Sequence, residues 1–139
     1  MPLTTAQITI GAIAYFDVDV LHADKGIHVT GDPVTRDVNG NQFVCYKVSG
    51  DQSYWAPLTG TYRHPRLPID SNWVSNGYGA LSAGKVWLQD GKNTYSGPNT
   101  SFIAATATEQ AFNAGQRPML SPAGMQAILK AIKARGGAL

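Results

Sequence analysis

The segment QFVCYKVSGDQSYWAPLTG, residues 42–60, carries the clearest strand pattern of this 139-residue chain. Its first part, Gln42–Val48, is rich in apolar, aromatic and β-branched residues, which favour β-strands. It follows Asn39-Gly40, a dipeptide typical of tight hairpin turns. Its second part begins at Ser53 and has the same composition up to Thr59. The sequence therefore predicts two strands here, each bounded by turn residues.

Short strands separated by turns are predicted on both sides of this segment. Residues 8–22 (ITIGAIAYFDVDVLH) combine β-branched and aromatic residues with partial alternation, which indicates a first strand. Residues 84–97 are predicted to form a hairpin with Asp90-Gly91 at its tip, and residues 100–107 (TSFIAATA) are predicted to form a further strand.

Helix is predicted only towards the C-terminus. Residues 106–115 have the composition for two or three helical turns. A stronger signal begins at Ser121 as N-cap with Pro122 in the first turn, and ends at Gly136. Four apolar residues of this segment fall on one face at helical spacing: Met125, Ile128, Leu129 and Ile132. That helix is expected to cover the open side of the β structure.

These patterns predict one domain, residues 1–139, of mainly β (β+α) class. A small, curled, mostly antiparallel β structure is expected over about residues 7–106. A helical C-terminal part is expected over about residues 107–136. The chain is long enough for one hydrophobic core and short for two.

The composition of the chain says more about where the protein is located than about its function. Eleven Lys and Arg residues face nine acidic ones, a mildly basic balance that does not by itself indicate nucleic acid. The one cysteine, Cys45, excludes an internal disulfide and lies in a predicted strand, where a buried thiol is far commoner than a catalytic one. No signal peptide and no apolar run of about 20 residues is present, so a cytoplasmic protein outside the membrane is expected.

Common cofactor sites have no motif in this sequence. The three histidines are scattered, and one cysteine cannot build a zinc site. No Walker loop, dinucleotide fingerprint or nucleophile elbow occurs. We therefore expect neither a metal nor a cofactor.

Polar side chains gather where predicted strands end. The three groups are His22, Asp24 and Lys25; then Thr59, Arg63, His64 and Arg66; and finally Lys85, Asp90 and Lys92. Because successive strand ends of a small barrel can converge on one rim, these groups are predicted to share a cleft. The densest is YRHPR, residues 62–66, in a chain with only 14% charged residues.

These residue types suit metal-independent cleavage of RNA. A base takes the proton of the 2′-hydroxyl, an acid protonates the leaving oxygen, and a cation stabilises the charge that develops on the phosphate. Arginine pairs with phosphate in bidentate fashion, and Tyr62 and Trp55 could stack on bases. Arg and Tyr are also enriched at protein interfaces, so the same cluster does not separate a binding module from a structural domain with these residues at an interface.

The order of these pieces resembles the MazF/PemK/Kid family of toxin endoribonucleases. Residues 11–20 (GAIAYFDVDV) stand where that family has its opening strand, and residues 22–26 (HADKG) are similar to its HEQxG loop. Residues 56–60 (APLTG) are similar to its [VA]P[VIL]TS strand end, residues 79–90 (GALSAGKVWLQD) to a later segment ending in Asp, and the C-terminal helix to its closing helix. The family's Arg-Pro has no counterpart, and about ten residues (TGDPVTRDVNGN, 30–41) are inserted.

The resemblance implies an SH3-like, partly open antiparallel β-barrel that dimerises, cuts single-stranded RNA by 2′-OH transesterification and is neutralised by an antitoxin protein. Carried over by position, His22 and Asp90 would be the acid–base pair, with Thr59 contacting phosphate. Arg63 would replace the missing arginine as the catalytic cation, unless Arg66 or Lys85 does so or the chemistry is altered or lost. The remaining candidates for substrate binding are Tyr62, His64, Arg66 and Lys85.

Two other classes of function stay open at this point. The first is a non-catalytic SH3-like module, or an accessory protein of a phage or mobile element, that contacts nucleic acid or a protein. The second is a structural β domain with residues 62–66 at an interface.

Overall fold

The computed structural model describes residues 3–38, 40–77, 79–106 and 117–139, and a long hairpin forms its centre. Strand β3 (Asn41–Ser49) runs antiparallel to β4 (Gln52–Thr59), so both strands predicted from residues 42–60 are confirmed. Ser49 pairs with Gln52, which leaves a two-residue turn. Gly50 begins this turn at φ +61°, the conformation that tight hairpins require there.

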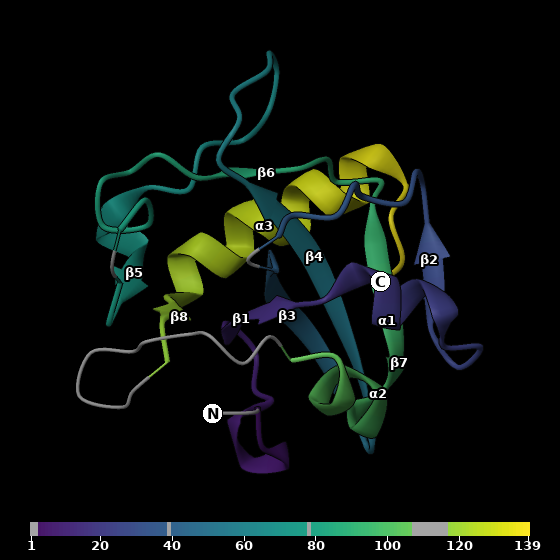
Figure 1. Cartoon of the computed structure of the whole chain (residues 1–139). Helices are drawn as coiled ribbons and strands as arrows, with labels where there is room; N and C mark the ends of the chain where they lie inside the picture. Colours follow the sequence, from purple (N-terminus) through teal and green to yellow (C-terminus); the bar gives the residue numbers. More distant parts are fainter. Residues whose placement is uncertain (1–2, 39, 78, 107–116) are drawn as a thin grey trace.

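The sheet grows from both sides of this hairpin (Figure 1). On one side β1 (Ile13–Phe16) pairs with β3. On the other, β6 (Trp87–Leu88) and β7 (Thr94–Pro98) pair with successive parts of β4, and β2 (His28–Thr30) pairs with β7. All these pairs are antiparallel, which confirms the mainly β class, but the sheet is not closed into a barrel. A small second sheet joins β5 (Val74–Ser75) to β8 (Met119–Leu120).

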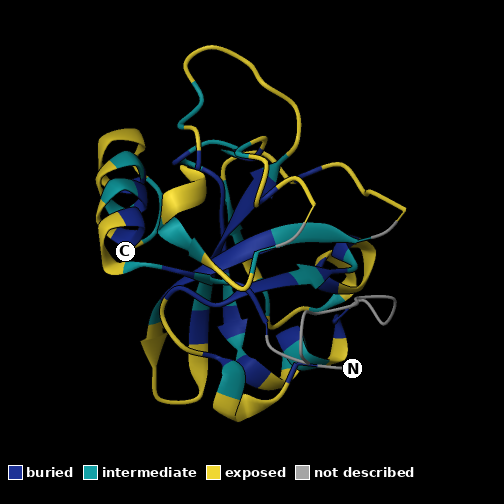
Figure 2. Ribbon diagram, turned by 90° about the vertical axis from the view of Figure 1, so that its left-hand side faces the viewer, coloured by how far each residue is buried: buried dark blue, intermediate teal, exposed yellow. Residues whose placement is uncertain are grey.

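Both faces of the central sheet are buried, as the dark blue strands of Figure 2 show. Alternate residues of β3 point to opposite sides: Phe43 and Cys45 enter one apolar cluster, and Val44 and Tyr46 enter another. Two short helices, α1 (Val18–Ala23) and α2 (Asn99–Ala104), contribute to the first cluster. The long helix α3 (Pro122–Arg135) contributes to the second.

Helix α3 confirms its prediction in detail. Ser121 caps its start by accepting a hydrogen bond from the Gly124 N–H at 3.3 Å, and Gly136 ends it in the left-handed conformation at φ +77°. Its apolar face is the predicted one, with Met125, Ile128 and Ile132 buried and Leu129 partly buried, and it covers one side of the sheet. The described residues also include two short 3₁₀ segments, η1 (Thr5–Gln7) and η2 (Ser71–Trp73).

One predicted element is longer than the strand that forms, and two predicted elements are wrong. The first strand ends at Phe16, because Asp17 accepts a hydrogen bond from the Asp19 N–H and caps helix α1. The strand predicted over residues 100–107 does not form in the described part, residues 100–106, since α2 occupies most of it. Residues 84–97 do not form a hairpin, because β6 and β7 both pair with β4 and not with each other.

Other predictions are tested only in part. The helix expected over residues 106–115 falls almost wholly outside the described residues, as does Asn39 of the expected Asn39-Gly40 turn. Among the helices that the structure describes, none combines the length and the apolar character of a membrane span.

Candidate functional site: an arginine-lined groove

The central hairpin determines where the main groove lies. In the antiparallel β3–β4 pair, Phe43 lies opposite Pro57, so the chain before β3 and the chain after β4 emerge at the same end of the sheet. The loop after β4 projects from that end in Figure 1 and is exposed in Figure 2. A groove of about 900 Å³ is lined mainly by residues 34–38 and 40–42, which form the wall before β3, and by residues of the segment 58–66, which form the wall after β4.

The charge in this groove is mostly positive. Among the residues that line it, Arg36, Arg63 and Arg66 face a single acidic residue, Asp37. Arg36 comes from the wall before β3, and Arg63 and Arg66 come from the wall after β4. The groove is therefore lined by arginines from both segments.

The wall before β3 is held in place by the first residue of that strand. The Asn41 side chain accepts a hydrogen bond from the Asp37 N–H at 2.9 Å and donates one to the Thr35 carbonyl at 2.8 Å. Arg36, between these two attachment points, also pairs with Asp19 of α1 at 3.5 Å. Both side chains of that ion pair are more than half exposed, so it contributes little to stability.

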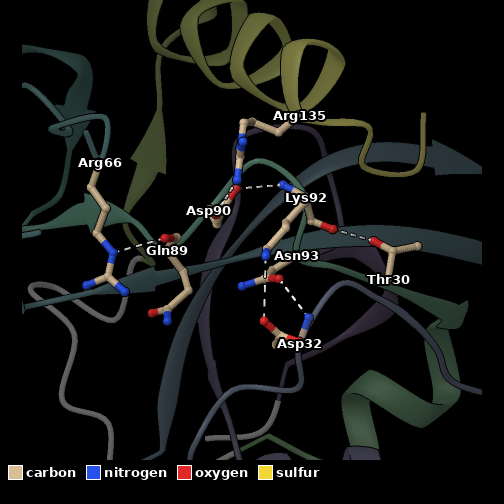
Figure 3. Close-up of polar contacts among 8 residues, drawn as sticks. All are labelled: Thr30, Asp32, Arg66, Gln89, Asp90, Lys92, Asn93 and Arg135. Carbon is tan, nitrogen blue, oxygen red and sulfur yellow. Dashed lines mark hydrogen bonds and ion pairs between the residues drawn. The ribbon is translucent and has the colours of Figure 1, made fainter. Parts of the chain in front are cut away.

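Arg66 holds the opposite wall. Its Nε donates to the Gln89 carbonyl at 3.0 Å (Figure 3). Its Nη1 donates to the Thr61 carbonyl at 2.7 Å. A further bond joins the Thr61 N–H to the Thr59 hydroxyl at 3.1 Å. Two of the five guanidinium donors of Arg66 are thus used inside the protein, which makes this residue first a support of the loop.

Arg63 is placed differently from the other two arginines. Its side chain is exposed in the groove and makes no hydrogen bond or ion pair with the residues that the structure describes. Its backbone carbonyl accepts from the Arg66 N–H at 2.7 Å, which orders the main chain beneath it. His64 is also exposed but does not line the groove. Of the predicted cations, Arg63 is therefore the one best placed to meet an anionic ligand.

His22 lies away from this groove, on helix α1. Its Nε2 is 2.7 Å from the Tyr95 hydroxyl, and that hydroxyl accepts from the Val34 N–H at 3.0 Å. Asp24, close by, accepts from the Gly26 N–H at 2.8 Å, and a hydrogen bond from the Ser101 side chain is the main cause that lowers its pKa. These hydrogen bonds connect α1 to the sheet and to α2. Of the residues that take part in them, only Val34 lines the groove.

Asp90 is engaged with helix α3 (Figure 3). Its carboxylate accepts from Nε and Nη2 of Arg135 at 3.1 and 3.2 Å, and from the Lys92 N–H at 3.0 Å. The Arg135 guanidinium is the main cause that lowers the pKa of this carboxyl group. A carboxylate stabilised in this way is a weaker base and is not a proton donor at neutral pH.

The structure does not bring His22 and Asp90 together. Helix α1, which carries His22, packs on the side of the sheet that holds Tyr95, whereas Asp90 is bound to α3 on the opposite side. Neither residue lines the groove, and nor does Lys85, which is exposed. Of the predicted site residues, the groove collects Thr59, Arg63 and Arg66.

Two aromatic predictions have different outcomes. Trp55 cannot stack on a base, because it is fully buried against Phe16 and Phe102. Tyr62 is 56% exposed and contacts the ring of Trp87, with 5.6 Å between ring centroids. Cys45 is buried, and burial raises the pKa of its thiol to about 12, so it is not a nucleophile.

Sequence reasoning missed three residues of this region: Arg36, Asn41 and Trp87. The sequence did contain a signal for Arg36 and Asn41. If the predicted strands 42–48 and 53–59 pair antiparallel, the residues that precede the first strand lie near the residues that follow the second. Trp87 had no comparable signal, because its place depends on β6 pairing with the far end of β4. Within the described residues, no group of His, Cys, Asp and Glu is arranged to hold a metal ion.

No model of a known protein family matches the chain, and neither a curated protein nor a solved structure shows significant similarity to it. Membership of the MazF/PemK/Kid family therefore stays a prediction that rests on the short motifs alone.

Proposed function

We propose that this protein binds single-stranded nucleic acid, with RNA as the expected ligand, through the arginine-lined groove. The observation that carries the proposal is that Arg36 and Arg63, from two separate segments of the chain, line one open groove together with Arg66. Guanidinium groups recognise phosphate through paired hydrogen bonds, and phosphate contacts supply most of the affinity in sequence-independent binding. Both walls are held by internal hydrogen bonds, so little order has to be gained on binding.

The proposal is one of binding and does not include catalysis. Cleavage by a His22–Asp90 pair would need both groups within reach of one scissile bond, and they lie on opposite sides of the sheet. The toxin role, the antitoxin partner and the homodimer belong to the family resemblance. RNA binding through the groove requires none of them.

A binding titration at several salt concentrations tests the proposal. A fluorescently labelled RNA of about 12 nucleotides is titrated with the wild-type protein, and anisotropy gives the affinity. If Arg36 and Arg63 each contact a phosphate, the logarithm of the affinity should fall with the logarithm of the salt concentration with a slope of about −1.4. Arg63→Ala should weaken binding and reduce the size of the slope by about 0.7.

The matched control is Lys133→Ala, which removes one exposed positive charge from α3. It should leave both the affinity and the slope close to those of the wild type. Equal losses in the two variants would mean that net charge, and not the groove, governs binding, and the proposal would be wrong. The same RNA is also incubated with protein in EDTA and run on a gel. Cleavage that His22→Ala abolishes would reinstate the ribonuclease hypothesis.

A further inference from the structure

We propose that the Tyr62–Trp87 pair is a stacking site for one unpaired base of the nucleic acid that the groove binds, an inference that rests on the proposed function. Tyr62 is the only large apolar side chain of the 60–66 loop that is strongly exposed, at 56%. Its ring contacts Trp87 with 5.6 Å between centroids and 54° between planes. Exposed aromatic surface of this kind is typical of sites that bind flat ligands.

The pair lies at the edge of the groove. Trp87 is directly opposite Thr59 in the β4–β6 ladder, so the two side chains lie on the same face, and Thr59 lines the groove. The residues on either side of Tyr62, Thr61 and Arg63, line the groove as well. A strand whose phosphates meet Arg63 would therefore carry its next base close to Tyr62.

The position of Trp87, next to Tyr62, is fixed by backbone pairing. Trp87 pairs with Thr59 on one side and with Pro68 on the other. The neighbouring Leu88 N–H donates to the Leu67 carbonyl at 2.9 Å, which ties the returning chain to β6. The tyrosine thus contacts, at a tilt, a ring that is built into the sheet. Stacking on a held ring costs less conformational entropy than stacking on a free side chain.

The chemistry of the site selects among ligands. A base has an exposed aromatic face only where the strand is unpaired, because pairing and stacking in a duplex cover it. Stacking requires no particular base, since every base has such a face. The site is therefore expected to favour single strands over duplexes with little sequence preference. A protein partner would instead be recognised without any dependence on bases.

The test compares two oligonucleotides of equal charge. One is a single-stranded RNA of about 12 nucleotides, and the other is an abasic strand with the same number of phosphates. Tyr62→Ala should weaken binding of the RNA by about 5- to 150-fold, the loss that removal of one stacking residue brings. It should leave binding of the abasic strand unchanged. Tyr62→Phe keeps the ring and should bind the RNA as the wild type does.

Ile10→Ala is the control, because Ile10 is a similarly exposed apolar residue, at 55%, that does not line the groove. A direct readout comes from RNA carrying 5-iodouridine, which should crosslink to Tyr62 or Trp87 on irradiation. If RNA and abasic strand bind equally and Tyr62→Ala has no effect, the stacking site is wrong while the groove proposal stands. If neither strand binds the wild type, both proposals are wrong.

Discussion

Replacing Arg66 with lysine tests whether this arginine stabilises the loop or is available to bind a ligand. Lysine keeps the positive charge but lacks the planar fork that now serves two carbonyl groups, those of Gln89 and Thr61. A single ammonium group can reach one of them at most in good geometry. A hydrogen bond from a charged donor is worth about 1.5–3 kcal/mol. Since Arg66 is only partly buried, we expect a loss of about 2 kcal/mol in the free energy of unfolding.

The assay is urea unfolding followed by tryptophan fluorescence. With a slope of about 2 kcal/mol per molar urea, a loss of 2 kcal/mol moves the midpoint down by about 1 M. Arg63→Lys is the matched control, because Arg63 has no polar side-chain partner within the described residues. It should change the free energy of unfolding by less than about 0.5 kcal/mol. An unchanged midpoint for Arg66→Lys would refute the view that Arg66 supports the loop. Arg66 would then count among the arginines that are available to bind a ligand.

Three further predictions concern the rest of the molecule. Asp90→Asn should lower the free energy of unfolding by about 1 kcal/mol at pH 7, because it breaks the ion pair with Arg135. The pKa of the Asp90 carboxyl is lowered in the folded protein, so its stabilising effect is present above the usual pKa of about 4 and is lost as the pH falls through the folded pKa. Urea titrations should therefore show the difference in free energy of unfolding between wild type and variant closing below about pH 4. Cys45 should resist alkylation at pH 8 until urea unfolds the chain, since burial raises its pKa to about 12; rapid modification of folded protein, seen by mass spectrometry, would contradict the buried assignment. Gly91→Ala should lower the melting temperature by several degrees, because the new Cβ would lie 2.2 Å from the Ala131 carbonyl oxygen and push α3 off the sheet, and an unchanged melting temperature would show that the helix moves freely.

The parts of the fold that could be predicted are those in which local pattern and tertiary packing agree. Strands β3 and β4 have a β-rich composition and a glycine at the turn that joins them, and the sheet buries both. Helix α3 has a capping serine, an apolar stripe and a terminal glycine, and the structure uses all three. Each of these signals lies within a few residues of the element that it defines.

The errors arose where two physical signals competed. Residues 18–22 contain β-branched residues that favour a strand, but Asp17 caps a helix there, and burial of Val18 and Leu21 in the core stabilises it. Residues 84–97 contain an Asp-Gly turn signal, but each of the flanking strands finds a better partner in β4. Propensity within a short segment cannot reveal such a long-range choice.

The candidate site shows the same division. The density of charge in residues 62–66 was visible in the sequence, but its meaning depends on how each side chain is engaged. Arg66 is committed to two carbonyl groups and Arg36 is shared with Asp19, whereas Arg63 is uncommitted among the described residues. Counting arginines therefore overstates the number available to a ligand. The pairing of β3 with β4 brings the segments that carry Arg36 and Arg63 to the same end of the sheet, and both residues line one groove there. This shared lining, more than the cluster itself, favours a phosphate-bearing strand.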